Sequence, residues 1–133
     1  MKRGFALALL ALAGCAFSIP IRPSLEGSRW QIRAINGDPM PPLPNYYVEF
    51  RHGQISGRMG CNLFSGPYRL DAEAIVVGGL STTEMACDAT TTAHEAAGLA
   101  ALRGRSLRIF WTDLGARLVL TSATGSMDLK RIR

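Results

Sequence analysis

The sequence predicts an α+β fold that is mostly antiparallel β: a curved or partly closed sheet of about seven to eight strands with one packed helix. Short runs of alternating apolar and polar residues recur along the chain, and they are separated by glycine, proline or asparagine. The alternation gives way to a helical period once, between residues 92 and 103. A length of 133 residues, with 47% apolar and 19% charged, is typical of one globular domain.

Three strands are predicted in the first part of the domain. Residues 28–35 alternate, residues 36–39 break this strand, and residues 40–44 form a proline-rich loop that cannot pair within a sheet. Residues 46–51 and 54–59 form a predicted hairpin, since an x-Gly pair, here His52-Gly53, favours a tight turn between alternating segments. The positions expected to face the core are Trp30, Ile32, Tyr46, Val48, Phe50, Ile55, Gly57 and Met59, with Ala34 as a further candidate in the first strand.

Further strand candidates lie on both sides of the helix. They are residues 64–70 and 74–77 before the helix, and 106–111, 117–121 and 127–132 after it. A short segment, residues 80–84, leads from the second of these to Met85-Ala86-Cys87. Asp113-Leu114-Gly115 and Ala123-Thr124-Gly125 separate the last three and are typical of hairpin turns. The order predicts an antiparallel sheet with the helix inserted before its last three strands.

The helix is predicted over residues 92–103, which are rich in alanine and leucine. Asp88 or Thr90 is the expected N-cap, and Gly104 is placed to end the helix. The apolar stripe expected to face the sheet consists of Ala96, Leu99 and Leu102.

The N-terminus has the features of an export signal. Met1-Lys2-Arg3 is basic, and the apolar run that follows over residues 5–12 is shorter than the about 20 residues of a membrane-spanning helix. The run ends in Leu12-Ala13-Gly14-Cys15, which resembles the lipobox of bacterial lipoproteins. We therefore expect a lipoprotein signal peptide over residues 1–14 and lipidation of Cys15. The alternative is an ordinary secretory signal cut nearby, with Cys15 incidental.

The residues after the signal predict a location. Ala16 stands where inner-membrane lipoproteins carry aspartate, so the lipobox resemblance implies an outer-membrane anchor with the domain facing the periplasm. Residues 15–27 carry two prolines and no helical period, which predicts a tether before a domain over residues 28–132. Without Lys2 and Arg3, the 15 basic side chains become 13 against 10 acidic ones. This mild excess predicts no nucleic-acid partner.

The other two cysteines predict a disulfide. Cys61 and Cys87 are an even pair in an exported chain, and no Cys-x-x-Cys motif is present, so a structural bridge is expected in preference to a redox site. A zinc site formed by this pair with His52 and His94 lacks the usual ligand spacing, so no metal is expected.

The sequence predicts neither an enzyme nor a cofactor. His94 and Glu95 are adjacent on the helix and point about 100° apart, and no Gly-x-Ser-x-Gly motif is present. Arg51, Arg58 and Arg69 are expected to form a solvated face in preference to an anion site. The aromatic residues Trp30, Tyr46, Tyr47, Phe50, Phe64 and Tyr68 are expected in the core in preference to a ligand cage.

One set of residues resembles a known family, the META domain or HslJ-like proteins of the bacterial envelope. The resemblance covers residues 25–132 and rests on Gly60, Cys61, Asn62, Gly66, Tyr68, Thr83, Met85, Ala86 and Cys87, with Glu95 and Leu102 in the helix. It implies antiparallel strands with a helix packed against the sheet, an envelope role linked to stress tolerance, and no enzymatic activity. Asn62 is expected to satisfy the backbone groups of a turn.

Two functions follow from these expectations. The first is a non-enzymatic outer-membrane lipoprotein that binds or stabilises another envelope component. The alternative is a pilotin-like carrier of a lipid or other apolar small molecule, held between the helix and a curved sheet.

Overall fold

The structure, a computed structural model, describes residues 14–16 and 23–133. The predicted signal residues 1–13 and tether residues 17–22 lie outside the described residues. The elements are β1 Ser28–Ile35, β2 Asp38–Pro39, β3 Tyr46–Arg51, β4 Gln54–Met59, β5 Leu63–Asp71, β6 Ala74–Val77, β7 Ser81–Thr82, α1 Ala89–Leu102, β8 Ser106–Thr112, the 3₁₀ turn η1 Asp113–Gly115, β9 Arg117–Ser122 and β10 Gly125–Arg131.

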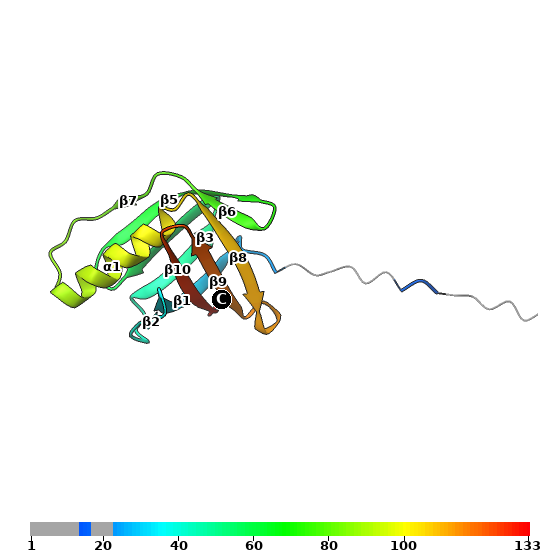
Figure 1. Ribbon diagram of the computed structural model, residues 1–133, viewed down its shortest axis with the longest axis horizontal. Coiled ribbons are helices and arrows are strands. Elements are labelled where there is room, and N and C mark those ends of the chain that lie inside the picture. Colours follow the sequence, from blue (N-terminus) through cyan, green and yellow to red (C-terminus); the bar gives the residue numbers. More distant parts are fainter. Residues whose placement is uncertain (1–13, 17–22) are drawn as a thin grey trace, which may run out of the picture.

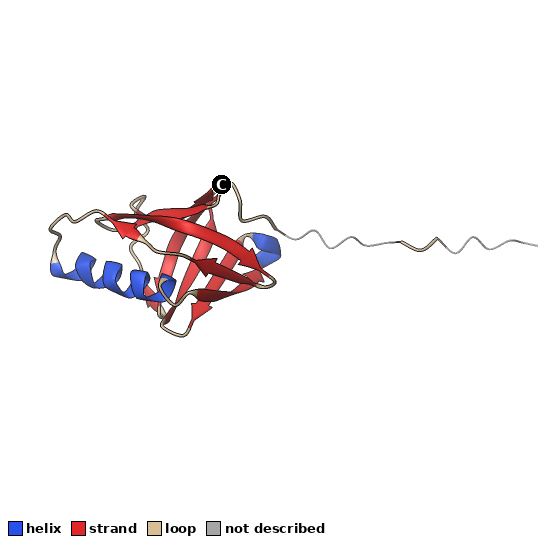
Figure 2. Cartoon of the chain, turned by 90° about the horizontal axis from the view of Figure 1, so that it is seen from above, coloured by secondary structure: helices blue, strands red, loops and turns tan. Residues whose placement is uncertain are grey.

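Eight antiparallel strands form a closed barrel in the order β10-β9-β8-β6-β5-β4-β3-β1. The ring closes where β1 pairs with β10, from Trp30 opposite Arg131 to Ile35 opposite Met127. The two-residue strands β2 and β7 lie outside this ring, on β1 and β5. The predicted fold class is thus confirmed, and the sheet is closed. Figures 1 and 2 show its strands wrapped around a common interior.

The barrel interior is filled by the apolar positions of the alternating strands. The inward set predicted for β1, β3 and β4 is buried except for Ala34, because a bulge between Ile32 and Ala34 places Ile35 in the core instead. Of the six aromatic residues, Tyr47 and Tyr68 are only partly buried. The largest fully buried side chains are Trp30, Phe50, Ile32, Ile35, Ile55, Met59, Ile75, Leu102, Leu107, Leu118, Leu120 and Met127.

Helix α1 covers one end of the barrel. Asp88 is its N-cap and accepts from Thr91 N at 3.0 Å, so the first turn begins at Ala89, before the predicted start at residue 92. The helix lies over the end at which β1, β4 and β9 finish and β10 begins, and Figure 2 shows it along this side. We call this the helix end. The opposite end, where β3, β5, β8 and β10 finish, is the pocket end.

The buried stripe of α1 differs from the predicted one. Ala96 is exposed, whereas the helix buries Gly98, Leu99, Ala101 and Leu102. Gly98 lies directly against Met59 and Ile35, so the absence of a side chain at this position lets the helix approach the barrel.

Two segments expected to be irregular are ordered against the barrel. Asp38 and Pro39 pair with the end of β1, so the break expected at residues 36–39 contains one short edge strand, whereas the proline-rich residues 40–44 carry no strand, as predicted. Leu25, in the predicted tether, is 2% exposed, and Gly27 N donates to Phe50 O at 2.7 Å. The last five residues of that tether, 23–27, are therefore packed onto the domain.

Candidate functional site

The motif cysteine pair forms a disulfide beside the helix end. Cys61 lies two residues after the end of β4, Cys87 directly precedes the N-cap of α1, and their Cα atoms lie 6.3 Å apart. The bridge joins the sheet to the start of the helix, because one cysteine follows β4 and the other precedes α1. The structure therefore contains the predicted disulfide.

Asn62 connects the two halves of the motif. Its Oδ1 accepts from Thr83 Oγ1 at 3.0 Å and from Met85 N at 2.7 Å, and its Nδ2 donates to Met85 O at 3.3 Å. The Glu95 carboxylate accepts the remaining donors, Asn62 Nδ2 at 3.0 Å and Asn62 N at 2.9 Å. Asn62 is 8% exposed, so these bonds replace water around a buried amide. We call this network, formed by Asn62, Thr83, Met85 and Glu95, the Asn62 clamp.

Gly60 and His94 complete the surroundings of the clamp. Gly60 has φ of +98°, and a Cβ there would lie 2.7 Å from Tyr46 Oη, so both conformation and space favour glycine. Tyr46 Oη is hydrogen-bonded to His94 Nδ1 at 2.9 Å. His94 and Glu95 thus have separate structural partners, as expected for neighbours on a helix that point in different directions.

The other motif residues lie outside the clamp. Gly66 passes close to a neighbouring loop, since a Cβ there would lie 2.6 Å from Gly79 O. Ala86 is exposed. Tyr68 is on β5 and packs edge-on against Phe50, with ring centroids 5.1 Å apart. The motif residues therefore lie in two separate regions of the barrel, one around the Asn62 clamp and one around Tyr68 on β5.

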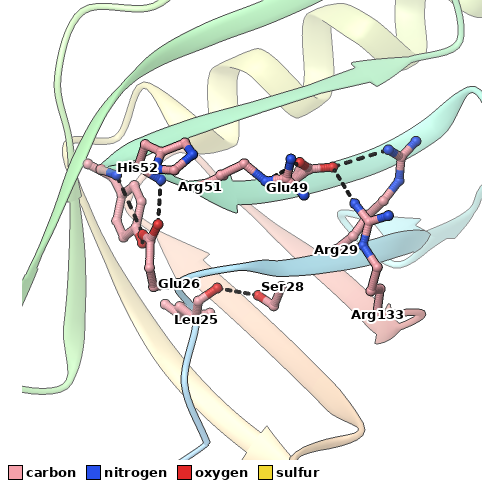
Figure 3. A network of polar contacts seen from close by, with 10 residues as sticks. Leu25, Glu26, Ser28, Arg29, Glu49, Arg51, His52 and Arg133 are labelled. Atoms are coloured by element: carbon pink, nitrogen blue, oxygen red, sulfur yellow. Dashed lines mark hydrogen bonds and ion pairs between the residues drawn. The ribbon is translucent and has the colours of Figure 1, made fainter.

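Tyr68 fastens the segment that leads into β1. Its Oη donates to Glu26 Oε2 at 2.6 Å, and the same carboxylate accepts from the backbone N–H groups of His52 and Gly53 in the β3–β4 turn. Figure 3 shows Glu26 below this turn. The hydrogen bond from Tyr68 lowers the pKa of Glu26, while burial and then the Glu26 bond raise the pKa of Tyr68. Sequence reasoning missed Glu26 because its partners are distant in sequence.

A group of arginines surrounds Glu49 nearby. Arg29, Arg51 and Arg133 approach its carboxylate at 3.1, 3.2 and 3.5 Å (Figure 3). Arg29 also lies over the Tyr47 ring, 3.8 Å from its centroid. Three cations share one carboxylate, so this Glu49 group carries two uncompensated positive charges, 3 − 1 = 2.

The predicted arginine face is divided by the structure. Arg51 belongs to the Glu49 group, while Arg69 pairs with Asp71 at 3.8 Å. Arg58 lies opposite Tyr47, and its Nε is buried without a hydrogen-bond partner. The three side chains share the outer surface but do not converge on one site.

An apolar pocket of about 560 Å³ lies at the pocket end. Its walls come from the segment before β1, the β5–β6 hairpin and the end of β8: Pro23, Leu25, Leu70, Ala72, Glu73, Ile109, Phe110, Trp111 and Thr112. Glu73 is the one ionisable side chain among them, so the site suits an apolar molecule or surface better than acid–base chemistry. Helix α1 is packed against the other end, so this is not the helix–sheet site expected from the sequence.

Three further features concern the lipidation of Cys15, metal binding and membrane-spanning helices. Cys15 is exposed and lies outside the disulfide, and its lipidation stays a prediction. Within residues 14–16 and 23–133, no cluster of three or more His, Cys, Asp or Glu side chains is arranged for a metal ion. In the same residues, no helix combines the length and apolar character needed to cross a bilayer.

Comparisons with known proteins agree with this architecture. One structure, described only as the NMR structure of the protein, has a TM-score of 0.67 at 26% identity and covers 80% of this chain and 90% of its own. Another, from Burkholderia xenovorans, has a TM-score of 0.64 at 18% identity over 99% of this chain and 98% of its own, which shows the fold alone. No curated protein sequence gives a significant match. The model of the META domain matches residues 23–131, so the chain belongs to the META domain family.

Proposed function

We propose that the protein is a non-enzymatic lipoprotein, anchored in the outer membrane through Cys15, whose META domain binds a component of the envelope. The Cys61–Cys87 disulfide is the observation that carries this proposal. Such bridges persist in oxidising compartments such as the periplasm and are rare in the cytosol. The lipobox-like Leu12-Ala13-Gly14-Cys15 supplies the means of anchoring.

The polar chemistry of the motif supports binding in preference to catalysis. The Glu95 oxygens accept both Asn62 donors, and His94 Nδ1 is occupied by Tyr46. A general acid or base needs a proton-transfer atom within reach of a substrate. These side chains instead hold α1 to β4 and to the segment before the helix.

Intact mass spectrometry of protein purified from its native membrane in detergent tests the proposal. The expected mass begins at Cys15, includes acyl chains, and increases on reduction by the pair of hydrogens that reopens the Cys61–Cys87 bridge. A non-acylated mass with two free thiols refutes both the anchor and the compartment. A screen of ester and peptide substrates with the same preparation tests the non-enzymatic assignment, which any specific turnover would overturn.

A second function, binding of an apolar small molecule, is favoured by the pocket at the pocket end. Its volume of about 560 Å³ and its apolar walls match those of ordinary ligand sites. Native mass spectrometry should detect a co-purified apolar compound. Leu70→Trp, which fills the pocket, should abolish this adduct, while Leu43→Trp in the loop before β3 should keep it. Equal adducts in both variants, or none in the wild type, would exclude the site.

A further inference from the structure

Exposed apolar side chains gather at the pocket end. Leu70, Phe110, Leu114 and Ile132 have exposed fractions of 56%, 50%, 106% and 53%, and they lie at or near the ends of β5, β8 and β10 and in η1. We call these four residues the apolar rim. Two of them, Leu70 and Phe110, also form walls of the apolar pocket. Large exposed apolar side chains that collect at one end of a domain mark a contact with something outside the chain.

Leu114 is the most pronounced member of the rim. It occupies the left-handed region, with φ of +55°, between Asp113 at +50° and Gly115 at +88°. A leucine in this conformation costs free energy, and its full exposure means that packing within the domain does not offset that cost. The η1 turn therefore presents an apolar side chain to the surroundings.

The rim lies beside positive charge. Figure 3 shows Arg51 beside His52 of the β3–β4 turn, with Arg29 and Arg133 on the other side of Glu49. Arg133 directly follows Ile132 of the rim, and β3 finishes at the pocket end. Arg131, at the end of β10, donates to Ser24 O at 3.4 Å. Acidic side chains at this end, Asp71, Glu73 and Asp113, lie in the β5–β6 hairpin and η1, so the positive charge is confined to the side formed by β1, β3 and β10. On that side, apolar and arginine side chains match the two layers of an anionic bilayer surface, its acyl boundary and its phosphates.

The N-terminal segment joins the barrel at this same end. Pro23 lines the pocket, and a Cβ on Gly115 would lie 2.7 Å from Pro23 Cγ, so the segment runs beside the turn that presents Leu114. Figure 1 shows residues 23–27 on the side of the barrel away from α1. From Cys15 to Pro23 the chain advances 23 − 15 = 8 residues, which span at most about 28 Å. An acyl anchor on Cys15 therefore holds the pocket end close to the membrane.

We propose that the pocket end docks on the surface of a bilayer that contains anionic phospholipid. Leu114, Phe110 and Leu70 enter the boundary between headgroups and acyl chains, and the Glu49 group contacts the lipid phosphates. The barrel thus stands on the membrane with α1 and the Asn62 clamp directed away from it. The argument from tether length rests on the proposed lipidation, whereas the apolar rim and the positive charge do not depend on it.

A fluorescent reporter at the rim tests the docking. Cys61 and Cys87 are bonded to each other and Cys15 is acylated under the proposal, so Leu114→Cys supplies a single thiol for an environment-sensitive dye. The matched control is Leu43→Cys, an exposed leucine (49%) in the loop before β3, which begins at the helix end. Both full-length proteins are purified from membranes and reconstituted into phosphatidylcholine vesicles with and without phosphatidylglycerol. The dye at 114 should shift to the blue and lose about half its intensity to brominated lipids, more strongly with phosphatidylglycerol, while the dye at 43 changes by less than about a tenth.

The outcomes separate docking from anchoring. Equal quenching at both positions, or none at 114 in acylated protein, overturns the docking and leaves the anchor intact. Selective quenching at 114 in Cys15→Ser protein, which has neither an acyl chain nor a second thiol, supports docking that does not need the anchor. A blue shift at 114 that depends on protein concentration and needs no vesicles assigns the rim to a second copy of the chain and overturns the proposal. Arg133→Glu should remove most of the added response to phosphatidylglycerol, and an undiminished response contradicts the role of the Glu49 group.

Discussion

Replacing Asn62 with alanine tests whether the motif works as a clamp. The substitution removes all four side-chain hydrogen bonds, two with Met85, one with Thr83 and one with Glu95. It keeps the disulfide and the backbone bond from residue 62 to Glu95. The variant therefore isolates the contribution of one amide.

The structure sets the size of the expected effect. Three neutral hydrogen bonds contribute about 1 kcal/mol each and the bond to a carboxylate about 2 kcal/mol, a ceiling of about 5 kcal/mol. Met85 is 51% exposed, so water recovers part of this when Asn62 is truncated. We expect the free energy of unfolding to fall by about 3 kcal/mol, which lowers Tm by about 10 °C in a domain of this size.

Urea unfolding, followed by tryptophan fluorescence without reductant, measures the change. Asn45→Ala is the matched control, because Asn45 is a partly buried asparagine whose Nδ2 makes one hydrogen bond, to Gly60 O at 2.6 Å. The control should lose about 1 kcal/mol. If Asn62→Ala loses no more than Asn45→Ala, the clamp is not the organising contact and the reasoning fails.

Three further variants test other parts of the fold. Cys61→Ser and Cys87→Ser should each cost about 3 kcal/mol of unfolding free energy, and the double variant should add little, whereas additive losses in chemical unfolding would refute the bridge. Gly98→Ala should destabilise by about 1 kcal/mol, because the new methyl collides with a methionine of β4 and this outweighs the gain in helix propensity; a higher Tm would contradict the close packing. The pKa of Glu26 is lowered from 4.5 by its bond from Tyr68, so its contribution to stability is complete above 4.5 and is lost as pH falls through the lower folded value. Glu26→Gln lacks that contribution, and its stability should fall less than wild type between about pH 6 and about pH 3; parallel pH profiles would contradict the bond.

The strands were predictable because one face of each is buried. Burial alternates strictly along β3 and β4, and along β1 as far as Ile32, so the sequence reports that face directly, since every second side chain enters the barrel. Which strands pair to close the sheet was not predictable, because the pairing of Trp30 with Arg131 joins residues at opposite ends of the domain sequence. Local periodicity contains no information on such partners.

The sequence identified which residues form the candidate site, but it did not predict which of them contact one another. The motif located Asn62, and the expectation that it satisfies backbone groups holds for Met85, but that residue belongs to a distant segment and not to a local turn. The pocket was missed because Ile109 and Trp111 alternate like any inward residues of a strand. Leu114, an apolar residue in an Asp-Leu-Gly turn, was the signal available in the sequence for the docking surface that we propose at this end of the barrel.

The pairing of β1 with β10 also determines which step of barrel folding can occur last. β1 is the first strand to emerge during synthesis and β10 the last, so the seam between them forms after all the other strands exist. Contacts of such long sequence separation are entropically costly and form slowly. Until β10 arrives, β1 and β9 each present an unpaired edge that invites pairing with another chain. Aggregation during biogenesis therefore competes with this single late step, and a chaperone that shields these two edges would raise the yield of the native barrel.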